Sequence, residues 1–268
     1  MKRILALAMV LLLAISMLTA CGEKVESDAA YIEGNGKLVI GYTIYEPMNY
    51  FDEAGKFTGF DTEFAEAVCA KLGLDADFVE IVWDTKEIEL NAKSIDCIWN
   101  GMTITEERAA NMSISLPYVK NAQVVVVKAD SAVASTADLA GKTVVAEIGS
   151  AGEAQVKGED ANADLAKATY VGLAKQTDCL LEVKAGAADA AVLDWTLAKS
   201  MVGAGTDFAD LKMVDGLELA AEEYGIAFRK DSDFTAKVNA AIEELVADGT
   251  LPAMAEKYGL ALAPSIDK

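Results

Sequence analysis

Two short segments of this chain share one design, and that repetition limits the folds the chain can adopt. Residues 95–101 (IDCIWNG) and 188–194 (ADAAVLD) each place an aspartate at the start of an apolar run with strand composition, and each run ends at polar residues. Strand-like and helix-like segments alternate around both copies, which is typical of an α/β protein. Two such halves predict two lobes that face each other across a cleft. The aspartates themselves, Asp96 and Asp189, are predicted to be turn or cap residues.

The end of the first segment carries the strongest candidate site. Its strand stops at Asn100 and Gly101, a hydroxyl follows at Thr103, and Thr105 begins a helical segment that carries Arg108. In open α/β sheets, ligands bind outside the carboxyl ends of strands, where helix N-termini point inward. An arginine there offers a rigid, charged fork that suits two carboxylate oxygens. The alternative is that Arg108 is a surface residue of a helix that Thr105 merely caps.

Local signals place two further elements that matter for the site. A helix is predicted to begin at residues 59–61 (GFD), with Asp61 as its cap, and to end at Gly73. Residues 123–127 are predicted to form an apolar strand, and residues 224–228 a strand that crosses back between the two halves.

The first twenty residues are predicted to be a signal peptide rather than part of the fold. Lys2 and Arg3 precede an apolar stretch, residues 4–17, that is too short to favour a membrane-spanning helix. The following residues, LTAC at 18–21, resemble the lipobox of bacterial lipoproteins, so Cys21 is expected to become a lipidated N-terminus. The alternative is an ordinary signal peptide with an incidental cysteine. Residues 22–36 are polar and contain glycine, which predicts that 21–36 form the lipidated cysteine and a flexible tether.

The charge of the chain excludes several function classes. The formal net charge is −20, and removal of the leader would make it more negative. Nucleic-acid binding and peripheral attachment to anionic lipid both need basic patches, so neither is expected. The chain contains no histidine, so we expect no metal site, no cofactor and no histidine-based catalysis. The remaining cysteines, Cys69, Cys97 and Cys179, lie in apolar patterns without CxxC spacing and are predicted to be buried free thiols.

Several motifs, taken together, are specific. They are GFD at 59–61, NGMTITEER at 100–108, SLPY at 115–118, ADA at 188–190 with Asp194, and YGIAF at 224–228. In this combination the chain resembles the solute-binding proteins of the polar amino-acid type (family 3), which are extracytoplasmic receptors of ABC importers. The similarity extends over residues 38–258.

The resemblance implies a two-lobed periplasmic-binding-protein-like fold (type II) of the α/β class. Each lobe would be a mixed sheet flanked by helices, and two hinge strands would join them. Lobe 1 would comprise residues 37–126 and 220–262, and lobe 2 residues 127–219. The hinges would lie near 127–128 and 219–224, and the lobes would close over a ligand.

The resemblance also implies the roles of individual residues. Opposite charges on opposite lobes suit a zwitterion, because each charged end loses hydration worth several kcal/mol unless it is paired. The ligand carboxylate is assigned to Arg108, Thr103, Ser150 and Ala151, and the ligand ammonium to Asp194, Gly101 and Thr103. The ligand side chain is assigned to the rings of Tyr45 and Trp83. Asn100, Glu46 and Glu147, where the chain departs from the family pattern, are assigned to it as well. For Tyr45 and Trp83 the alternative is core packing, and for Glu147 it is a solvated surface position.

The expected function is therefore an amino-acid-binding receptor, not an enzyme. The acidic residues Glu46 and Glu147 favour a polar or cationic amino acid. The expected partners are the free amino acid and a membrane permease of the ABC type, with the protein acting as a monomer anchored by lipid on the outer face of the cytoplasmic membrane. The alternatives are a dehydratase-like enzyme on the same fold, with Glu147 as its acid, or a ligand-sensing lipoprotein.

Overall fold

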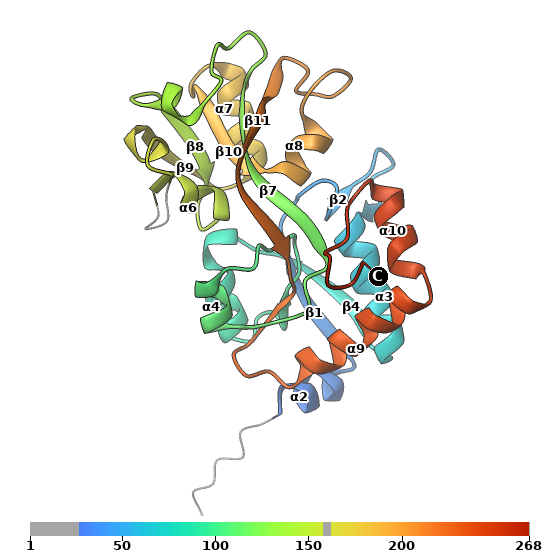
Figure 1. Ribbon diagram of the computed structural model, residues 1–268. Coiled ribbons are helices and arrows are strands. Elements are labelled where there is room, and N and C mark those ends of the chain that lie inside the picture. Colours follow the sequence, from blue (N-terminus) through green and yellow to red (C-terminus); the bar gives the residue numbers. More distant parts are fainter. Residues whose placement is uncertain (1–26, 158–161, 268) are drawn as a thin grey trace, which may run out of the picture.

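The chain is built around two five-stranded sheets, one in each of two lobes (Figure 1). This computed structural model describes residues 27–157 and 162–267. The predicted signal peptide (1–20), Cys21 and residues 22–26 of the predicted tether lie outside the described residues. The α/β class and the mixed sheets flanked by helices are confirmed.

The first lobe holds a mixed sheet. In it, β1 pairs in parallel with β4 and β5, whereas β12 pairs in antiparallel fashion with β5 and β6. The sheet has the order β4 (Asp75–Glu80), β1 (Lys37–Tyr42), β5 (Cys97–Ile98), β12 (Ala227–Phe228) and β6 (Ser113–Ile114), beside a hairpin of β2 (Tyr50–Phe51) and β3 (Phe57–Thr58). The helices of this lobe are α2 (Asp28–Asn35), α3 (Phe60–Leu72), α4 (Lys86–Asn91) after a 3₁₀ turn (Trp83–Thr85), α5 (Glu106–Asn111), α9 (Phe234–Ala247) and α10 (Thr250–Tyr258).

The second lobe repeats this plan with the same pattern of strand directions. Its strands β8, β9 and β10 are parallel to one another where they pair, and β7 runs antiparallel to both β10 and β11. The order is β11 (Leu211–Tyr224), β7 (Val119–Lys128), β10 (Ala190–Asp194), β8 (Thr143–Glu147) and β9 (Thr169–Leu173). The helices are α6 (Ala151–Lys157), α7 (Gln176–Ala185) and α8 (Trp195–Met201), with 3₁₀ turns at Thr136–Leu139 and Leu165–Lys167.

The strands β7 and β11 connect the two lobes as one antiparallel ribbon (Figure 1). Near the first lobe, Val119 pairs with Tyr224, and Tyr224 also bridges to Thr103. Residues 123–127 of β7 pair with β10 in the second sheet, so this part of β7, which the sequence assigns mostly to the first lobe, lies in the second. The strand β11 is also longer than predicted, because the sequence places a hinge near 219–224 and a strand at 224–228, whereas β11 begins at Leu211.

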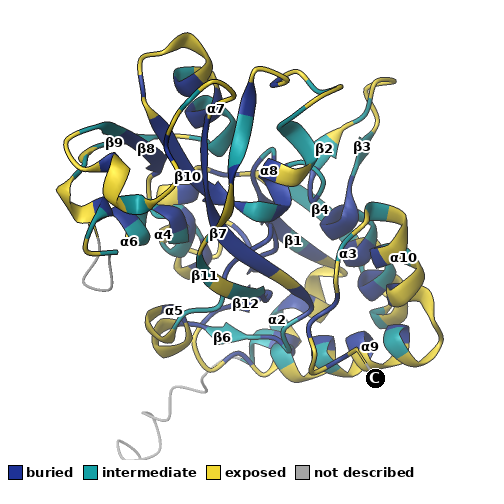
Figure 2. Ribbon diagram, turned by 45° about the horizontal axis from the view of Figure 1, so that its top comes forward, coloured by how far each residue is buried: buried dark blue, intermediate teal, exposed yellow. Residues whose placement is uncertain are grey.

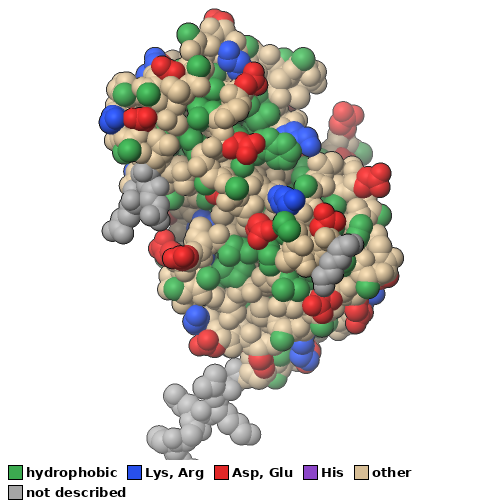
Figure 3. Space-filling model, viewed as in Figure 1, with side chains coloured by type: hydrophobic (Ala, Val, Ile, Leu, Met, Phe, Trp, Pro, Cys, Tyr) green, Lys and Arg blue, Asp and Glu red, His purple; other side chains and the backbone are tan. Residues whose placement is uncertain are grey.

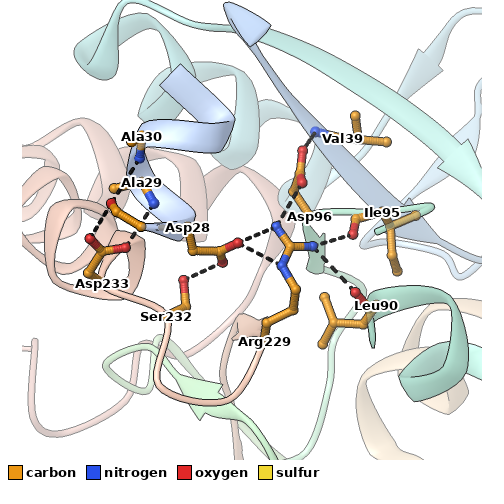
Figure 4. Close-up of polar contacts among 11 residues, drawn as sticks. Asp28, Ala29, Ala30, Val39, Leu90, Ile95, Asp96, Arg229, Ser232 and Asp233 are labelled. Carbon is orange, nitrogen blue, oxygen red and sulfur yellow. Dashed lines mark hydrogen bonds and ion pairs between the residues drawn. The ribbon is translucent and has the colours of Figure 1, made fainter. Parts of the chain in front are cut away.

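The predicted tether is wrong over residues 28–35, which form the helix α2. Such a short helix is marginal by itself, and tertiary contacts stabilise it here. The carboxylate of Asp28 lies 2.7 Å from the guanidinium of Arg229, which also pairs with Asp96 at 2.9 Å (Figure 4). The hydroxyl of Ser232 donates to the carboxylate of Asp28 at 2.6 Å. The carboxylate of Asp233 accepts the backbone N–H of Ala29, which follows Asp28 in α2, at 2.8 Å.

The start of α3 also differs from the prediction. Its N-cap is Gly59 rather than Asp61, and Gly59 has a φ of +130°. A Cβ at this position would lie 2.2 Å from the carbonyl oxygen of Met48, so only glycine fits. Asp61 lies inside the first turn with no exposed surface, where its carboxylate accepts the N–H of Gly101.

Buried apolar residues fill both lobes, and most of β7 is buried as it passes between them (Figure 2). Cys69, Cys97 and Cys179 are buried free thiols, as predicted. On the face drawn in Figure 3, basic side chains lie singly among acidic ones and do not form a patch. Within residues 27–157 and 162–267, no helix has the length and apolar character needed to span a bilayer.

Candidate functional site

A buried pocket lies between the two lobes, at the ends of β5 and β10. All but one of the residues predicted to contact a ligand line it. It leaves a cavity of about 20 Å³, roughly the space for one water molecule. An amino acid can therefore enter only if the lobes separate or lining side chains move. The lining residues are Thr43, Ile44, Tyr45, Trp83, Asn100, Gly101, Thr103, Arg108, Glu147, Ser150, Ala151, Gln176, Asp194 and Leu197.

Glu46 is the predicted site residue that does not line the pocket. Its carboxylate accepts a hydrogen bond from Ser200 of α8 at 2.9 Å instead. Glu46 thus joins the first lobe to the second outside the pocket, and its predicted contact with a ligand side chain is not supported. Conversely, Thr43, Gln176 and Leu197 line the pocket although no sequence signal pointed to them.

Arg108 is buried in the wall of this pocket, with 8% of its surface exposed. Thr105 caps α5 by accepting the N–H of Arg108 at 3.1 Å. The guanidinium donates to the carbonyl oxygen of Thr103 at 2.7 Å and to that of Gly149, in the other lobe, at 3.0 Å. Within the described part of the chain, no ion pair involves Arg108. The surface-helix alternative is wrong, and Arg108 presents a buried positive charge that backbone carbonyls hold in place.

The turn after β5 depends on Gly101. This residue has a φ of +55°, and a Cβ would lie 2.6 Å from the ring of Tyr45. Its N–H donates to the buried carboxylate of Asp61 at 2.6 Å, and the hydroxyl of Tyr118 donates to the same oxygen at 3.0 Å. Burial raises the pKa of Asp61 from 3.8 to about 7. Because Asp61 holds the N–H of Gly101, only the carbonyl of this residue is left to contact a ligand.

The polar residues near Gly101 already have protein partners. Thr103 donates its hydroxyl to Glu222 at 2.9 Å. The amide of Asn100 donates to the carbonyl of Thr43 and to Asn49, both at 2.8 Å, and accepts from the hydroxyl of Thr43 at 2.7 Å. The amide of Asn100 therefore holds the first lobe together even though the residue lines the pocket.

Asp194 faces the pocket from the second lobe, at the end of β10. One carboxylate oxygen accepts from Asn121 at 2.6 Å and from Gln123 at 2.7 Å, and the other accepts from Gln176. Gln176 also accepts the backbone N–H of Asp194 at 3.1 Å. Burial raises the pKa of Asp194, while three neutral amides stabilise its ionised form. A cation entering the pocket would meet a pre-oriented carboxylate.

The helix terminus of the second lobe lies at Ser150 and Ala151, and α6 begins at Ala151. The hydroxyl of Ser150 accepts the N–H of Glu153 at 3.0 Å, which makes it a cap. Both residues line the pocket. They lie beside Gly149, whose carbonyl accepts from Arg108, and the hydroxyl of Ser150, which only accepts in its capping bond, can still donate to a ligand.

Glu147 also lines the pocket and has only 4% of its surface exposed, so the solvated alternative is wrong. Burial raises its pKa to about 8, the charge of Asp194 acts in the same direction, and the charge of Lys86 opposes them. Lys86, which the sequence did not single out, is also buried, and its Nζ lies 4.7 Å from the ring centroid of Trp83. Burial lowers the pKa of Lys86 to about 8.

The rings of Tyr45 and Trp83 are both buried, and both line the pocket. Trp83 belongs to an apolar cluster of the first lobe and also lines the pocket. Tyr45 is 3% exposed, and its hydroxyl forms a short hydrogen bond with that of Tyr224. Both rings are core residues with one surface toward the pocket. Within the described residues, no three metal-ligating side chains gather into a metal site.

Comparison with known proteins gives matches over most of the chain. A family model described as bacterial extracellular solute-binding proteins, family 3, matches residues 38–261. The arginine-binding extracellular protein ArtP of Bacillus subtilis is 32% identical over 244 residues, which cover 90% of this chain and 92% of ArtP.

Two solved structures extend these matches. Holo ArgBP from T. maritima has a TM-score of 0.73 and 36% identity, with 85% of this chain and 98% of that chain covered. The ancestral amino-acid-binding protein AncCDT-1, described as a precursor of cyclohexadienyl dehydratase, has a TM-score of 0.76 and 30% identity, with 87% and 99% covered.

Proposed function

This chain belongs to the bacterial extracellular solute-binding proteins of family 3, and from that premise we propose that it binds a free polar or cationic amino acid between its lobes and delivers it to the permease of an ABC importer. The observation that supports this most is that Arg108 of the first lobe and Asp194 of the second line one buried pocket without bonding to each other.

The two charges fit the two ends of an α-amino acid. The guanidinium of Arg108 suits an α-carboxylate, and Ser150 and Ala151 lie where they could assist it. The hydroxyl of Thr103 could assist only by leaving the carboxylate of Glu222. The carboxylate of Asp194, with the carbonyl of Gly101, suits the α-ammonium. Because each buried charge costs several kcal/mol when unpaired, a zwitterion gains most when both lobes contact it together. Ligand binding and lobe closure would then be the same event.

Contacts between the lobes support such a closed form. The carbonyl of Gly149 accepts from both Arg108 and Lys86, at 3.0 and 3.1 Å. At the edge of the cleft, Lys175 pairs with Glu80 at 3.1 Å. The ribbon of β7 and β11 is the proposed hinge, because it is the element that runs from one sheet to the other.

The side-chain end of the pocket favours a polar or cationic ligand. Glu147 offers a buried carboxyl group whose ionised form a cationic ligand would stabilise. The ring of Trp83 offers an aromatic surface, although Lys86 and Arg108 already lie 4.7 and 5.9 Å from its centroid. The relative ArtP is described as arginine-binding, and a truncated ArgBP from T. maritima is described in an arginine-bound form. These observations support a cationic amino acid as the preferred ligand.

The test is the substitution Arg108→Ala. A thermal-shift screen over the proteinogenic amino acids would first identify the best ligand, since a bound ligand stabilises the folded state by mass action. Calorimetry with that ligand should then show an affinity lower by roughly two to four decades, because removing one member of a buried charge pair costs about 3–5 kcal/mol. Lys230→Ala, which removes an exposed cation of the same lobe, should bind as the parent does. An Arg108→Ala affinity within about threefold of the parent would refute the assignment.

A second candidate function is a dehydratase-like reaction in the same pocket. Burial raises the pKa of Glu147 to about 8, so this carboxyl keeps its proton at neutral pH and could act as a general acid. Incubation of the protein with candidate amino acids, followed by mass analysis for loss of water, separates this candidate from binding alone.

We further propose that residues 1–20 are a signal peptide and that Cys21 carries the lipid that holds the protein at the outer face of the cytoplasmic membrane as a monomer. The support is the leader pattern that ends in LTAC at 18–21. A Cys21→Ser variant should lose its lipid and leave the membrane fraction. Retention there would contradict the anchor.

A further inference from the structure

Lys86 of the first lobe contacts the loop of the second lobe that leads to the pocket. It is the first residue of α4, which lies next to α6 of the other lobe (Figure 1 and Figure 2). Its Nζ donates to the carbonyl of Gly149, between β8 and α6, at 3.1 Å, and to the carbonyl of Trp83, in its own lobe, at 3.2 Å. The side chain thus joins a turn of one lobe to a loop of the other.

The ammonium group of Lys86 is buried, with 5% of the residue exposed. Within residues 27–157 and 162–267 no ion pair involves it, and its hydrogen bonds go to the two backbone carbonyls. A hydrogen bond from a charged donor is stronger in a buried place, because water does not compete for it there. The bond to Gly149 exists only while the lobes are together, so it stabilises the closed form relative to an open one.

Gly149 provides the other half of this contact. Its N–H donates to Glu153 of its own lobe at 2.7 Å, whereas its carbonyl accepts from Lys86 and Arg108 of the first lobe. A Cβ at Gly149 would lie 3.3 Å from the Cα of Asp84, a backbone atom of the first lobe. A side chain there would crowd that backbone, and the lobes would have to move apart to relieve it.

The contact lies beside the pocket rather than in it. Ser150 and Ala151, which follow Gly149, line the pocket, whereas among the described residues Lys86 is not part of its lining. Lys86 instead lines a neighbouring cavity of about 340 Å³, together with Arg108 and Gly149. It can therefore hold the loop that carries Ser150 and Ala151 without contacting an amino acid in the pocket.

We propose that Lys86 is a positioning residue for ligand binding: by holding the carbonyl of Gly149, it keeps Ser150 and Ala151 against the ligand and slows the release of the ligand. This inference rests on the proposed function. Because Lys86 acts on the loop and not on the ligand side chain, it should slow the release of every amino acid that binds and leave their order of affinity unchanged. Gly149 must be glycine for the lobes to approach closely enough to form the bond.

The test is Lys86→Met, which keeps an unbranched apolar side chain and removes the ammonium group. The probes are the proteinogenic amino acids, with L-arginine measured first. Stopped-flow kinetics should show dissociation about tenfold faster than from the parent and association within about twofold of it, since the variant lacks one buried hydrogen bond from a charged donor. Calorimetry should give the same order of affinity among the amino acids for the variant and the parent.

The matched control is Lys199→Met. Lys199 also donates to a backbone carbonyl of the other lobe, that of Gly259 at 2.9 Å, but this bond is exposed, so water can replace it. The variant should release L-arginine at a rate within about twofold of the parent. If Lys199→Met speeds dissociation as much as Lys86→Met does, the inference is overturned, because any contact between the lobes would then have the same effect.

A pair of glycine variants tests the other side of the contact and decides the question if Lys86→Met does not fold. Gly149 and Gly141 lie in the same lobe with φ of +74° and +75°, and no atom lies within 4 Å of a Cβ added to Gly141. The backbone strain of the two alanine variants is therefore alike. Gly149→Ala should bind L-arginine at least about fivefold more weakly than Gly141→Ala, and equal affinities would overturn the inference.

Other outcomes separate this inference from the proposed function. A parent that binds no proteinogenic amino acid overturns both. If the parent binds and Lys86→Met releases its ligand at the parent rate, the inference is overturned and the receptor function stands. A changed order of affinity among the amino acids has the same consequence, because it would mean that Lys86 contacts the ligand side chain.

Discussion

The two mirrored segments use the same local contacts in the two lobes. In the first lobe, Asp96 donates its N–H to the carbonyl of Val39 at 2.7 Å and accepts the N–H of Val39 at 3.0 Å. In the second, Asp189 makes the same pair of bonds with Thr143, at 2.9 and 2.8 Å. Each aspartate joins the start of its strand to the neighbouring parallel strand.

The surroundings of the two aspartates differ. Asp96 is 2% exposed and pairs with Arg229, which also holds α2 (Figure 4). The side chain of Asp189 is 45% exposed and pairs with Lys142 at 3.5 Å. The same local contact is therefore expected to contribute more to stability where it is buried, because water does not screen or replace it there.

The other ends of the two segments differ as well. After β5, the N–H of Gly101 donates to a carboxylate, Asp61, whereas the N–H of Asp194 at the end of β10 donates to a neutral amide, Gln176. Both acceptors lie in the first turn of a helix. The contact at the strand end of the first lobe can therefore depend on pH, because its acceptor is titratable. The matching contact in the second lobe does not, because its acceptor is a neutral amide.

The sharpest test of the comparison is Asp96→Ala against Asp189→Ala. Removing Asp96 leaves a buried arginine partly unpaired, which should lower the free energy of unfolding by about 3–5 kcal/mol. Removing Asp189 deletes an exposed pair and one hydrogen bond, worth about 1 kcal/mol. Urea unfolding of both variants measures the difference. Equal losses would show that burial does not distinguish the two segments.

A smaller effect is expected at the turn of the first lobe. Gly101→Ala forces a Cβ onto a φ of +55° and against the ring of Tyr45, which should cost about 2–4 kcal/mol and weaken ligand binding. Gly73→Ala is the matched control, since Gly73 has a φ of +71° with no atom within 4 Å of the added Cβ. It should cost about 1–2 kcal/mol. If both variants lose the same stability, the clash with Tyr45 does not contribute to the loss.

The smallest expected effect is the pH dependence that Asp61 creates. Its pKa rises from 3.8 to about 7 on folding, so the folded state holds this proton more tightly than the unfolded state does. Stability should therefore fall as pH rises between about 4 and 7, by about 2 kcal/mol between pH 5 and 7. Asp61→Asn should remove that part of the slope.

Glu147 and Glu222 act in the same direction as Asp61, so the informative quantity is the difference between parent and variant. Glu66→Gln, which removes an exposed carboxylate of the same helix, should keep the slope of the parent. An Asp61→Asn variant with the slope of the parent would contradict a protonated Asp61.

Much of the site could be predicted because it lies in continuous motifs. Residues 100–108 bring Gly101, Thr103 and Arg108 to one strand end, and Asp194 ends the matching strand of the other lobe. The predicted ligand contact of Glu46 is not supported, because the sequence does not show on which side of its loop the carboxylate lies. The burial of Asp61, Lys86 and Glu222 was not predicted. Each has ordinary neighbours in the sequence, and only the packing of distant residues around them buries their charged groups.

The sequence by itself determined the α/β class, the two mirrored halves and the residues at their strand ends, because hydrophobic periodicity and turn residues act over a few neighbours. The tertiary structure alone decided that α2 is a helix, that β11 is a long hinge strand and that Glu222 shares hydrogen-bond donors with Asp194. Those features depend on contacts between residues far apart in the chain, such as Asp28 with Arg229 and Thr103 with Glu222. These contacts are stable because they are buried, and a short segment of sequence does not show which of its residues will be buried.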